Sequence, residues 1–100
     1  MVKHIVFWTL KDSAEGRSAH QNAKEMKKRL EALNGRIPGL IKLEVGIDFG
    51  RTEASADVAL YSELSDRNAL NHYKNHPEHV AVSDFVGKIR HDRTVVDYEI

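Results

Sequence analysis

The sequence predicts an α+β fold of the ferredoxin-like type, with the order βαββαβ and an antiparallel sheet that carries both helices on one face. Four short stretches of alternating or continuous apolar residues indicate strands. Apolar residues at three- and four-residue steps, after the first stretch and again after the third, indicate the two helices. The length of 100 residues fits one domain, which we place at 1–100.

The first strand is predicted at 2–10. Two capping signals precede the first helix, Asp12 with Glu15 and then Ser18 with Gln21, and the apolar stripe of the helix follows the second. Asn34 and Gly35 predict the end of that helix. The apolar stripe of the helix consists of Ala23, Met26, Leu30, Leu33 and Ile37.

Two further strands are predicted at 40–49 and 57–64, joined by a polar loop that we interpret as a hairpin connection. Gly46 indicates a bulge or a close backbone approach in the first of them. Ser65 is predicted to cap the second helix. The last strand is predicted at 93–100.

The first strand is apolar on both faces, with Val6 and Trp8 on one and Ile5 and Phe7 on the other. Helices cover only one face of a ferredoxin-like sheet, so the other face needs a separate cover. We expect a second subunit to supply it, in a homodimer. His4 shares the face of Val6, and is either a buried histidine bonded to the backbone or part of a pocket wall.

The stretch YKNHPEH, residues 73–79, is predicted to break the second helix. Pro77 has no amide hydrogen and disfavours a helical conformation at His76. One segment should therefore end near Asn75 and another begin at Pro77, where the fixed φ of proline suits a first turn. The apolar stripe of the second segment places His79 on its inner side.

Tyr73 and His79 then face inward from opposite sides of the break, toward the sheet face that carries His4. A phenol and imidazoles that converge on an apolar pocket can move a proton and hold an enolate oxygen. These three are the candidate catalytic residues. The ligand pocket around them is expected to include Val6, Trp8, Leu60, Ser62, Val82 and Arg93.

The histidines have another interpretation, because His72, His76 and His79 are spaced as a metal site on an unbroken helix would be. Pro77 breaks that helix and no suitably spaced carboxylate completes the set, so we predict no metal site from these residues and no cofactor. His76 is then a cap at the helix junction and His72 a solvated side chain.

Composition excludes several classes of protein. The 15 basic and 15 acidic side chains cancel, which does not favour binding to nucleic acid or to an anionic membrane. No apolar run approaches the ~18 residues of a membrane span. The absence of cysteine excludes disulfides and thiolate chemistry, and fits a cytoplasmic protein. No phosphate-binding loop, dinucleotide fingerprint or nucleophile elbow is present.

Five segments in order, VKHIVFW, IPGLIKLEVG, DVALYSEL, YKNHPEHVAV and RTVVDYEI, resemble the Dabb family of stress-responsive A/B barrel domains. The resemblance extends from end to end. It implies a ferredoxin-like monomer that pairs sheet to sheet as a dimeric α/β barrel, with a pocket between the sheet and the helices of each subunit.

The resemblance also implies site residues. A plant branch of the family contains a polyketide cyclase that closes a ring by aldol condensation without a cofactor, and its catalytic tyrosine and histidine fall on Tyr73 and His79, with a pocket histidine on His4. Trp8, Ser62 and Arg93 depart from that pocket and favour a smaller or more polar ligand. Some plant members hold magnesium through backbone carbonyls, which would be those of Asn34, Ile37 and Leu40.

Two classes of function remain. The first is a cofactor-independent cyclase, lyase or isomerase that acts on a small carbonyl compound. The second is a non-catalytic, stress-associated dimer that binds a small ligand in the same pocket. A cofactor-independent monooxygenase of the dimeric-barrel kind is a related alternative.

Overall fold

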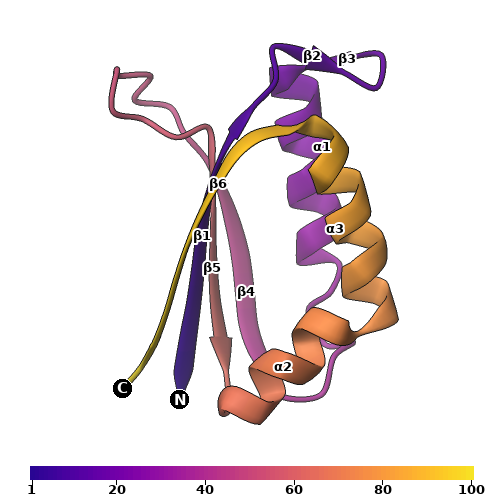
Figure 1. The fold of residues 1–100 in the computed structure, drawn as a ribbon, viewed down its shortest axis with the longest axis vertical. Helices are drawn as coiled ribbons and strands as arrows, with labels where there is room; N and C mark the ends of the chain where they lie inside the picture. The colour runs from indigo at the N-terminus through magenta and orange to yellow at the C-terminus, as the bar shows by residue number, and fades with distance from the viewer.

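The computed structural model describes residues 1–100 as two layers, a four-stranded sheet and a layer of helices (Figure 1). The elements are β1 (Val2–Leu10), β2 (Ser13–Ala14), β3 (Arg17–Ser18), α1 (Ala19–Glu31), β4 (Leu40–Ile47), β5 (Val58–Leu64), α2 (Arg67–Asn75), α3 (Pro77–Ile89) and β6 (Arg90–Glu99). The predicted βαββαβ order is confirmed, with the second helix divided in two. The short β2–β3 hairpin before α1 was not predicted.

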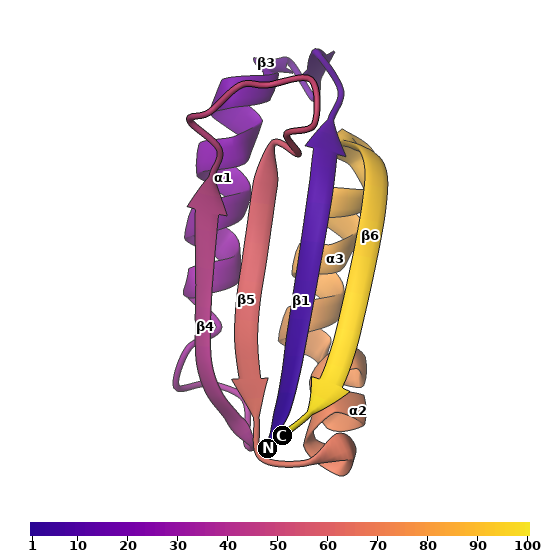
Figure 2. The ribbon, with the colours of Figure 1, turned by 90° about the vertical axis from the view of Figure 1, so that its left-hand side faces the viewer.

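The sheet has the strand order β4-β5-β1-β6, and every neighbouring pair is antiparallel. All three helices lie on one face, and Figure 2 shows the other face without any covering element. Large apolar side chains remain exposed on that open face. They include Phe7 at 42%, Val96 at 48% and Tyr98 at 43% exposure. The first strand is thus apolar on both sides, as predicted, but this chain covers only one of them.

The hydrophobic core lies between the sheet and the helices. Met26 of α1, Leu60 and Leu64 of β5 and Ile89 of α3 are all almost completely buried there. Each belongs to the apolar face of its element, so the periodicity of the sequence accounts for the core.

Helix α1 begins at the second of the two predicted capping signals and ends earlier than predicted. Ser18 and Gln21 form a complete capping box at its start. The helix ends at Glu31 instead of continuing to Asn34, because the next amides bond three residues back in tight turns: Leu33 N–H donates to the Leu30 carbonyl at 3.0 Å. Leu33 nevertheless remains buried in the core.

Three other local predictions were wrong. Asp66, not Ser65, is the N-cap of α2, and its carboxylate accepts the Ala69 amide at 2.7 Å. Gly46 lies in regular pairing with β5, and the irregularity of β4 falls at its start, between 40 and 42. Strand β4 ends at Ile47 instead of Phe49.

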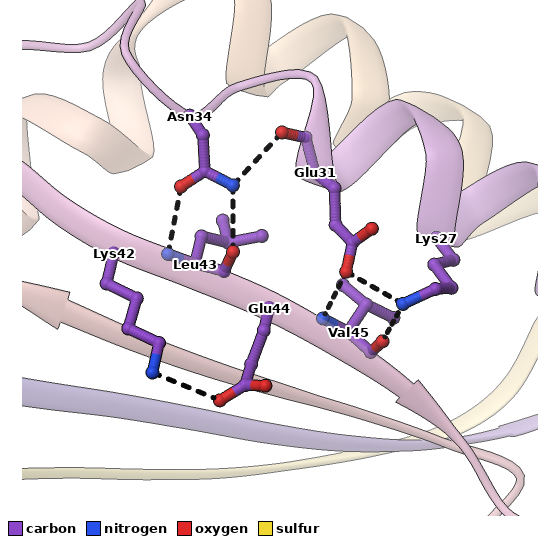
Figure 3. A network of polar contacts seen from close by, with 7 residues as sticks. All are labelled: Lys27, Glu31, Asn34, Lys42, Leu43, Glu44 and Val45. Carbon is purple, nitrogen blue, oxygen red and sulfur yellow. Dashed lines mark hydrogen bonds and ion pairs between the residues drawn. The ribbon is translucent and has the colours of Figure 1, made fainter.

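Strand β4 forms one edge of the sheet, and side chains from α1 and the turn after it cover that edge (Figure 3). The amide of Asn34 donates to the Leu43 carbonyl at 2.8 Å and accepts from the Leu43 N–H at 3.0 Å. The Glu31 carboxylate accepts the Val45 N–H at 3.1 Å, while the Lys27 ammonium donates to the Val45 carbonyl. These side chains take the place of a neighbouring strand, so the edge offers few free groups for pairing with another chain.

The loop between β4 and β5 connects two antiparallel neighbours, as the hairpin interpretation predicted. Figure 1 shows it extending beyond the sheet on the side away from the helices. Phe49, in this loop, is 97% exposed. The loop therefore adds an apolar side chain near the end of the open sheet face.

Candidate active site

A cavity of about 340 Å³ lies between the helices and the covered face of the sheet. The three candidate catalytic residues all line it, as do four of the six predicted pocket residues: His4, Val6, Trp8, Leu60, Tyr73, His79 and Arg93. Ser62 and Val82 do not line it. The Ser62 hydroxyl is buried and donates to the His4 carbonyl at 2.8 Å, while Val82 packs against the core.

The helix break occurs where Pro77 predicted it. Helix α2 ends at Asn75 and α3 begins at Pro77, with His76 extended between them at φ −64° and ψ 133°. The His76 ring Nδ1 accepts the Glu78 amide at 3.1 Å and so caps α3, as expected. The break brings Tyr73 and His79 together: their ring centroids lie 4.3 Å apart, with 47° between the planes.

The hydrogen bond of His79 defines the state of its ring. Nδ1 lies 3.2 Å from the Lys74 carbonyl oxygen. A carbonyl only accepts, so Nδ1 carries a hydrogen, and in the neutral ring the lone pair is then on Nε2. Burial lowers the pKa of His79 below its ordinary value. The ring is therefore neutral at pH 7, with a free base at Nε2.

Tyr73 is completely buried, and its hydroxyl has no hydrogen-bond partner within the chain. Burial raises the pKa of Tyr73 well above its ordinary value, and the positive charge of Arg93 only partly opposes this. The phenol thus stays protonated and is available as a hydrogen-bond donor inside the cavity.

His4 faces the cavity from β1, and its ring lies edge-on to Tyr73 with centroids 6.0 Å apart. Its Nδ1 is hydrogen-bonded to the carboxylate of Asp97, directly across from it on β6. Burial lowers the pKa of His4, and the Asp97 carboxylate offsets this only in part. We therefore describe the pair as a neutral imidazole that donates from Nδ1 to Asp97, which fixes the ring and leaves Nε2 free.

Asp97 was not among the predicted residues. Its position in the last strand carries no signal of its own, because only the β1–β6 register shows that it faces His4. The Lys74 ammonium lies 3.8 Å from the other oxygen of the same carboxylate. Asp97 is a positioning residue, since it reaches the cavity only through His4.

Five more lining residues were missed: Leu30, Ser83, Val86 and Gly87 belong to the helices, and Arg90 begins β6. Arg90 precedes the predicted start of the last strand at Arg93, so no sequence pattern placed it in the site. Trp8 contributes a polar atom that the sequence analysis did not consider. Its indole Nε1–H is buried and has no acceptor.

The metal interpretations find little support in this geometry. No group of three or more His, Asp or Glu side chains is arranged to hold a metal ion. The magnesium set suggested by the resemblance consists of carbonyls only. The Ile37 carbonyl already accepts the Leu40 amide at 3.1 Å, and the side chain of Asn34 is engaged with β4. Magnesium is usually bound through at least one carboxylate, so this donor set fits it poorly.

The family model of the stress-responsive A/B barrel domain, Dabb, matches residues 2–100. The chain belongs to the Dabb family. A dimeric protein of unknown function and ferredoxin-like fold from Bacteroides fragilis NCTC 9343 is 34% identical, with a TM-score of 0.87 over 99% of this chain and 95% of that one. No curated protein gives a significant sequence match.

Two more distant structures share the fold of this Dabb chain. A dimeric ferredoxin-like protein of unknown function from Thermobifida fusca YX is 22% identical, with a TM-score of 0.84 over 99% of this chain and 90% of that one. A hydroxynitrile lyase from Passiflora edulis is 17% identical, with a TM-score of 0.82 over 99% of this chain and 92% of that one.

None of the helices in the Dabb chain is both long and apolar enough to span a membrane.

Proposed function

We propose that this Dabb protein is a cofactor-independent lyase, cyclase or isomerase that removes a proton next to the carbonyl group of a small compound. The observation that carries the proposal is the Tyr73 hydroxyl, which is buried, protonated and unpartnered in the wall of a cavity. An unpaired buried hydroxyl costs about 1–3 kcal/mol of stability. A ligand oxygen that accepts from it would recover this free energy.

The residues take the following roles. His79 Nε2 accepts the proton from the carbon next to the carbonyl. The electron pair of that C–H bond forms the carbon–carbon double bond of the enolate, and the π electron pair of the carbonyl moves to its oxygen. The Tyr73 hydroxyl, which is buried in the cavity wall, donates to the enolate oxygen that forms. His4, fixed by Asp97, holds the ligand from the sheet side. In an isomerisation, His79 returns the proton to a carbon of the enolate. In a cyclisation, the enolate carbon attacks a second carbonyl carbon of the compound, the π electron pair of that carbonyl moves to its oxygen, and His79 gives its proton to the alkoxide that forms. In a lyase reaction, the enolate expels the group on the β carbon, which leaves with the bonding electron pair and takes the proton from His79.

Burial lowers the pKa of His79, which supports its role as the base. An imidazole that stays neutral at pH 7 has its lone pair available, and a positioned base contributes about 10²–10⁴ in rate. The hydroxynitrile lyase with the same fold supports a lyase as one reaction class that this framework can carry.

We also propose that the protein works as a homodimer joined through the open sheet face. The exposed Phe7, Val96 and Tyr98 on that face support this, and so do the dimeric neighbours. Light scattering at micromolar concentration should give about twice the 11.4 kDa chain mass. A stable monomer under those conditions would contradict the dimer.

The alternative is a dimer that binds a small ligand without reacting with it. The same unpartnered Tyr73 hydroxyl favours this candidate, because it would hold a ligand oxygen whether or not a proton moves.

Exchange of carbon-bound hydrogen in D₂O separates the two candidates without knowledge of the product. Ketones, aldehydes and oxo acids are incubated with the protein, and loss of the signal of the hydrogen next to the carbonyl is followed by proton NMR. We expect the wild type to accelerate exchange in at least one compound. His79→Ala should lower that rate about 10²–10⁴-fold. Tyr73→Phe should lower it as well, while both variants remain folded.

His72→Ala is the matched control, since His72 is an exposed imidazole in α2 next to Tyr73 and does not line the cavity. It should exchange at the rate of the wild type. Exchange that persists at the wild-type rate in both His79→Ala and Tyr73→Phe would refute these roles. Binding of a compound with no exchange would favour the ligand-binding dimer.

A further inference from the structure

We propose that the ligand of this cavity carries a carboxylate, which Arg90 and Arg93 bind at the cavity mouth. Combined with the proposed function, which assigns the carbonyl, this makes the substrate class a small oxo acid. The carboxylate subsite itself depends on four features of the structure: the path of β6, the pairing of the arginines, the polarity of the lining and the position of the mouth.

The path of β6 brings both arginines to one face. Residues three apart on a regular strand lie on opposite faces. Here Arg93 pairs with Trp8 and Arg90 pairs with Leu10, so β6 has one more residue than β1 between these two pairs. Such an irregularity redirects side chains. Arg90 and Arg93 consequently both line the cavity on the helix-covered side.

Neither arginine has an anionic partner within the chain. Four of the other five arginines are paired with carboxylates: Arg29 with Glu25, Arg36 with Glu78, Arg51 with Asp48 and Asp57, and Arg67 with Glu99. Arg90 and Arg93 make no such pair. No Asp or Glu lines the cavity, and the nearby Asp97 is already engaged by His4 and Lys74.

The polarity of the lining complements a ligand that is anionic at one end. The positive charge of Arg93 contributes to the lowered pKa values of His4 and His79, after the larger effect of burial. Trp8 stands directly across from Arg93, and its unpartnered indole N–H offers a donor on the same side of the cavity. A carboxylate is the planar acceptor that a guanidinium fork fits best.

The position of the mouth sets the orientation of the ligand. The exposed lining residues are Ser83 and Gly87 of α3 and Arg93 of β6, so the cavity opens between these elements. His4 and Tyr73 are buried. The carboxylate therefore stays at the arginines while the carbonyl reaches Tyr73. A volume of about 340 Å³ is near the lower end for small-molecule sites, which limits the acid to a short chain or one ring.

Equilibrium binding of 4-oxopentanoate and of its methyl ester tests the subsite. The two probes share the ketone and the chain, and only the acid carries a negative charge. Two-dimensional ¹H–¹⁵N NMR titration gives the affinity of each. Because charge-assisted hydrogen bonds contribute more than neutral ones, the wild type should bind the acid about tenfold or more tightly than the ester.

Arg90→Gln and Arg93→Gln should each weaken binding of the acid about tenfold and leave binding of the ester unchanged. Arg17→Gln is the matched control, because Arg17 is also exposed and has no carboxylate partner but lies in the β2–β3 hairpin outside the cavity. It should leave both affinities unchanged. Gly87→Leu should weaken binding of both probes, since it fills the mouth.

Equal affinity for acid and ester would overturn the proposal, as would a preference for the acid that persists in the Arg90→Gln/Arg93→Gln variant. Failure of the acid to bind at millimolar concentration would overturn it too. Tighter binding of inorganic phosphate than of the acid would also overturn the proposal, because the subsite would then be assigned to a phosphate group. Binding is measured without turnover, so a failure here is distinct from a failure of hydrogen exchange.

Discussion

Replacing Tyr73 by Phe should make the protein more stable. The Tyr73 ring is completely buried and packs against His79, while its hydroxyl has no partner. Phenylalanine keeps the ring and removes only the unpaired polar atom. Desolvation of an unsatisfied buried hydroxyl costs about 1–3 kcal/mol, and a gain of about 1 kcal/mol is expected once small losses in packing are included.

That gain corresponds to a Tm increase of about 4–8 °C for a chain of this length. Thermal unfolding followed by circular dichroism at one fixed protomer concentration measures it, because a dimer makes Tm depend on concentration. Tyr61→Phe is the control: the Tyr61 hydroxyl donates to the Glu63 carboxylate at 2.6 Å, so its loss should be neutral or slightly destabilising.

A Tm of Tyr73→Phe that falls by several degrees would refute the reasoning. It would mean that the hydroxyl is satisfied in the folded protein, and the site would lose the donor on which the proposed function depends. A stabilised variant that also loses activity would instead identify Tyr73 as a residue kept for function at a cost in stability.

Three further predictions concern pH, the cavity mouth and the sheet edge. Burial lowers the pKa of both His4 and His79, so the unfolded chain binds more protons than the folded one. The free energy of unfolding should therefore fall as pH drops below about 6.5, which urea unfolding at several pH values measures. No such fall is expected if the two imidazoles are solvated. Gly87→Ala should raise the free energy of unfolding by about 0.5–1 kcal/mol, because Gly87 lies in α3 and an added Cβ meets nothing within 4 Å; a loss of stability would show that the space is filled. Asn34→Ala should lower the free energy of unfolding by about 1–3 kcal/mol and promote aggregation through β4, because the Leu43 N–H and carbonyl lose their partner. An unchanged midpoint in urea, with no new oligomers in light scattering, would contradict this prediction.

The helix break illustrates what local sequence rules decide. Pro77 excludes a helical conformation before it and favours a new first turn, whatever surrounds it. The break therefore followed from the sequence, and so did the cap formed by His76. The boundary of α1 shows the limit of such rules. Leu33 continues the apolar repeat of the helix, yet it lies in the turn beyond, because burial requires only that a side chain reach the core.

Only some of the residues of the candidate site could be predicted from the sequence. The apolar face of each helix and strand was enough to predict that His4, Tyr73 and His79 line one cavity. The pairing of His4 with Asp97 needed the register of two strands that are 93 residues apart in the chain. Ser62 shares the face of Leu60, but its hydroxyl donates to the β1 backbone and the residue does not line the cavity.

The sequence by itself determined the order of elements, the break at Pro77 and the apolar faces of each strand and helix, because these depend on residues a few positions apart. Only the tertiary structure decided which groups meet. The β1–β6 irregularity turned Arg90 toward Arg93, and packing left the Tyr73 hydroxyl without a partner. Strand register and cavity shape arise from contacts between distant segments, and a periodic pattern contains no information about how those segments align.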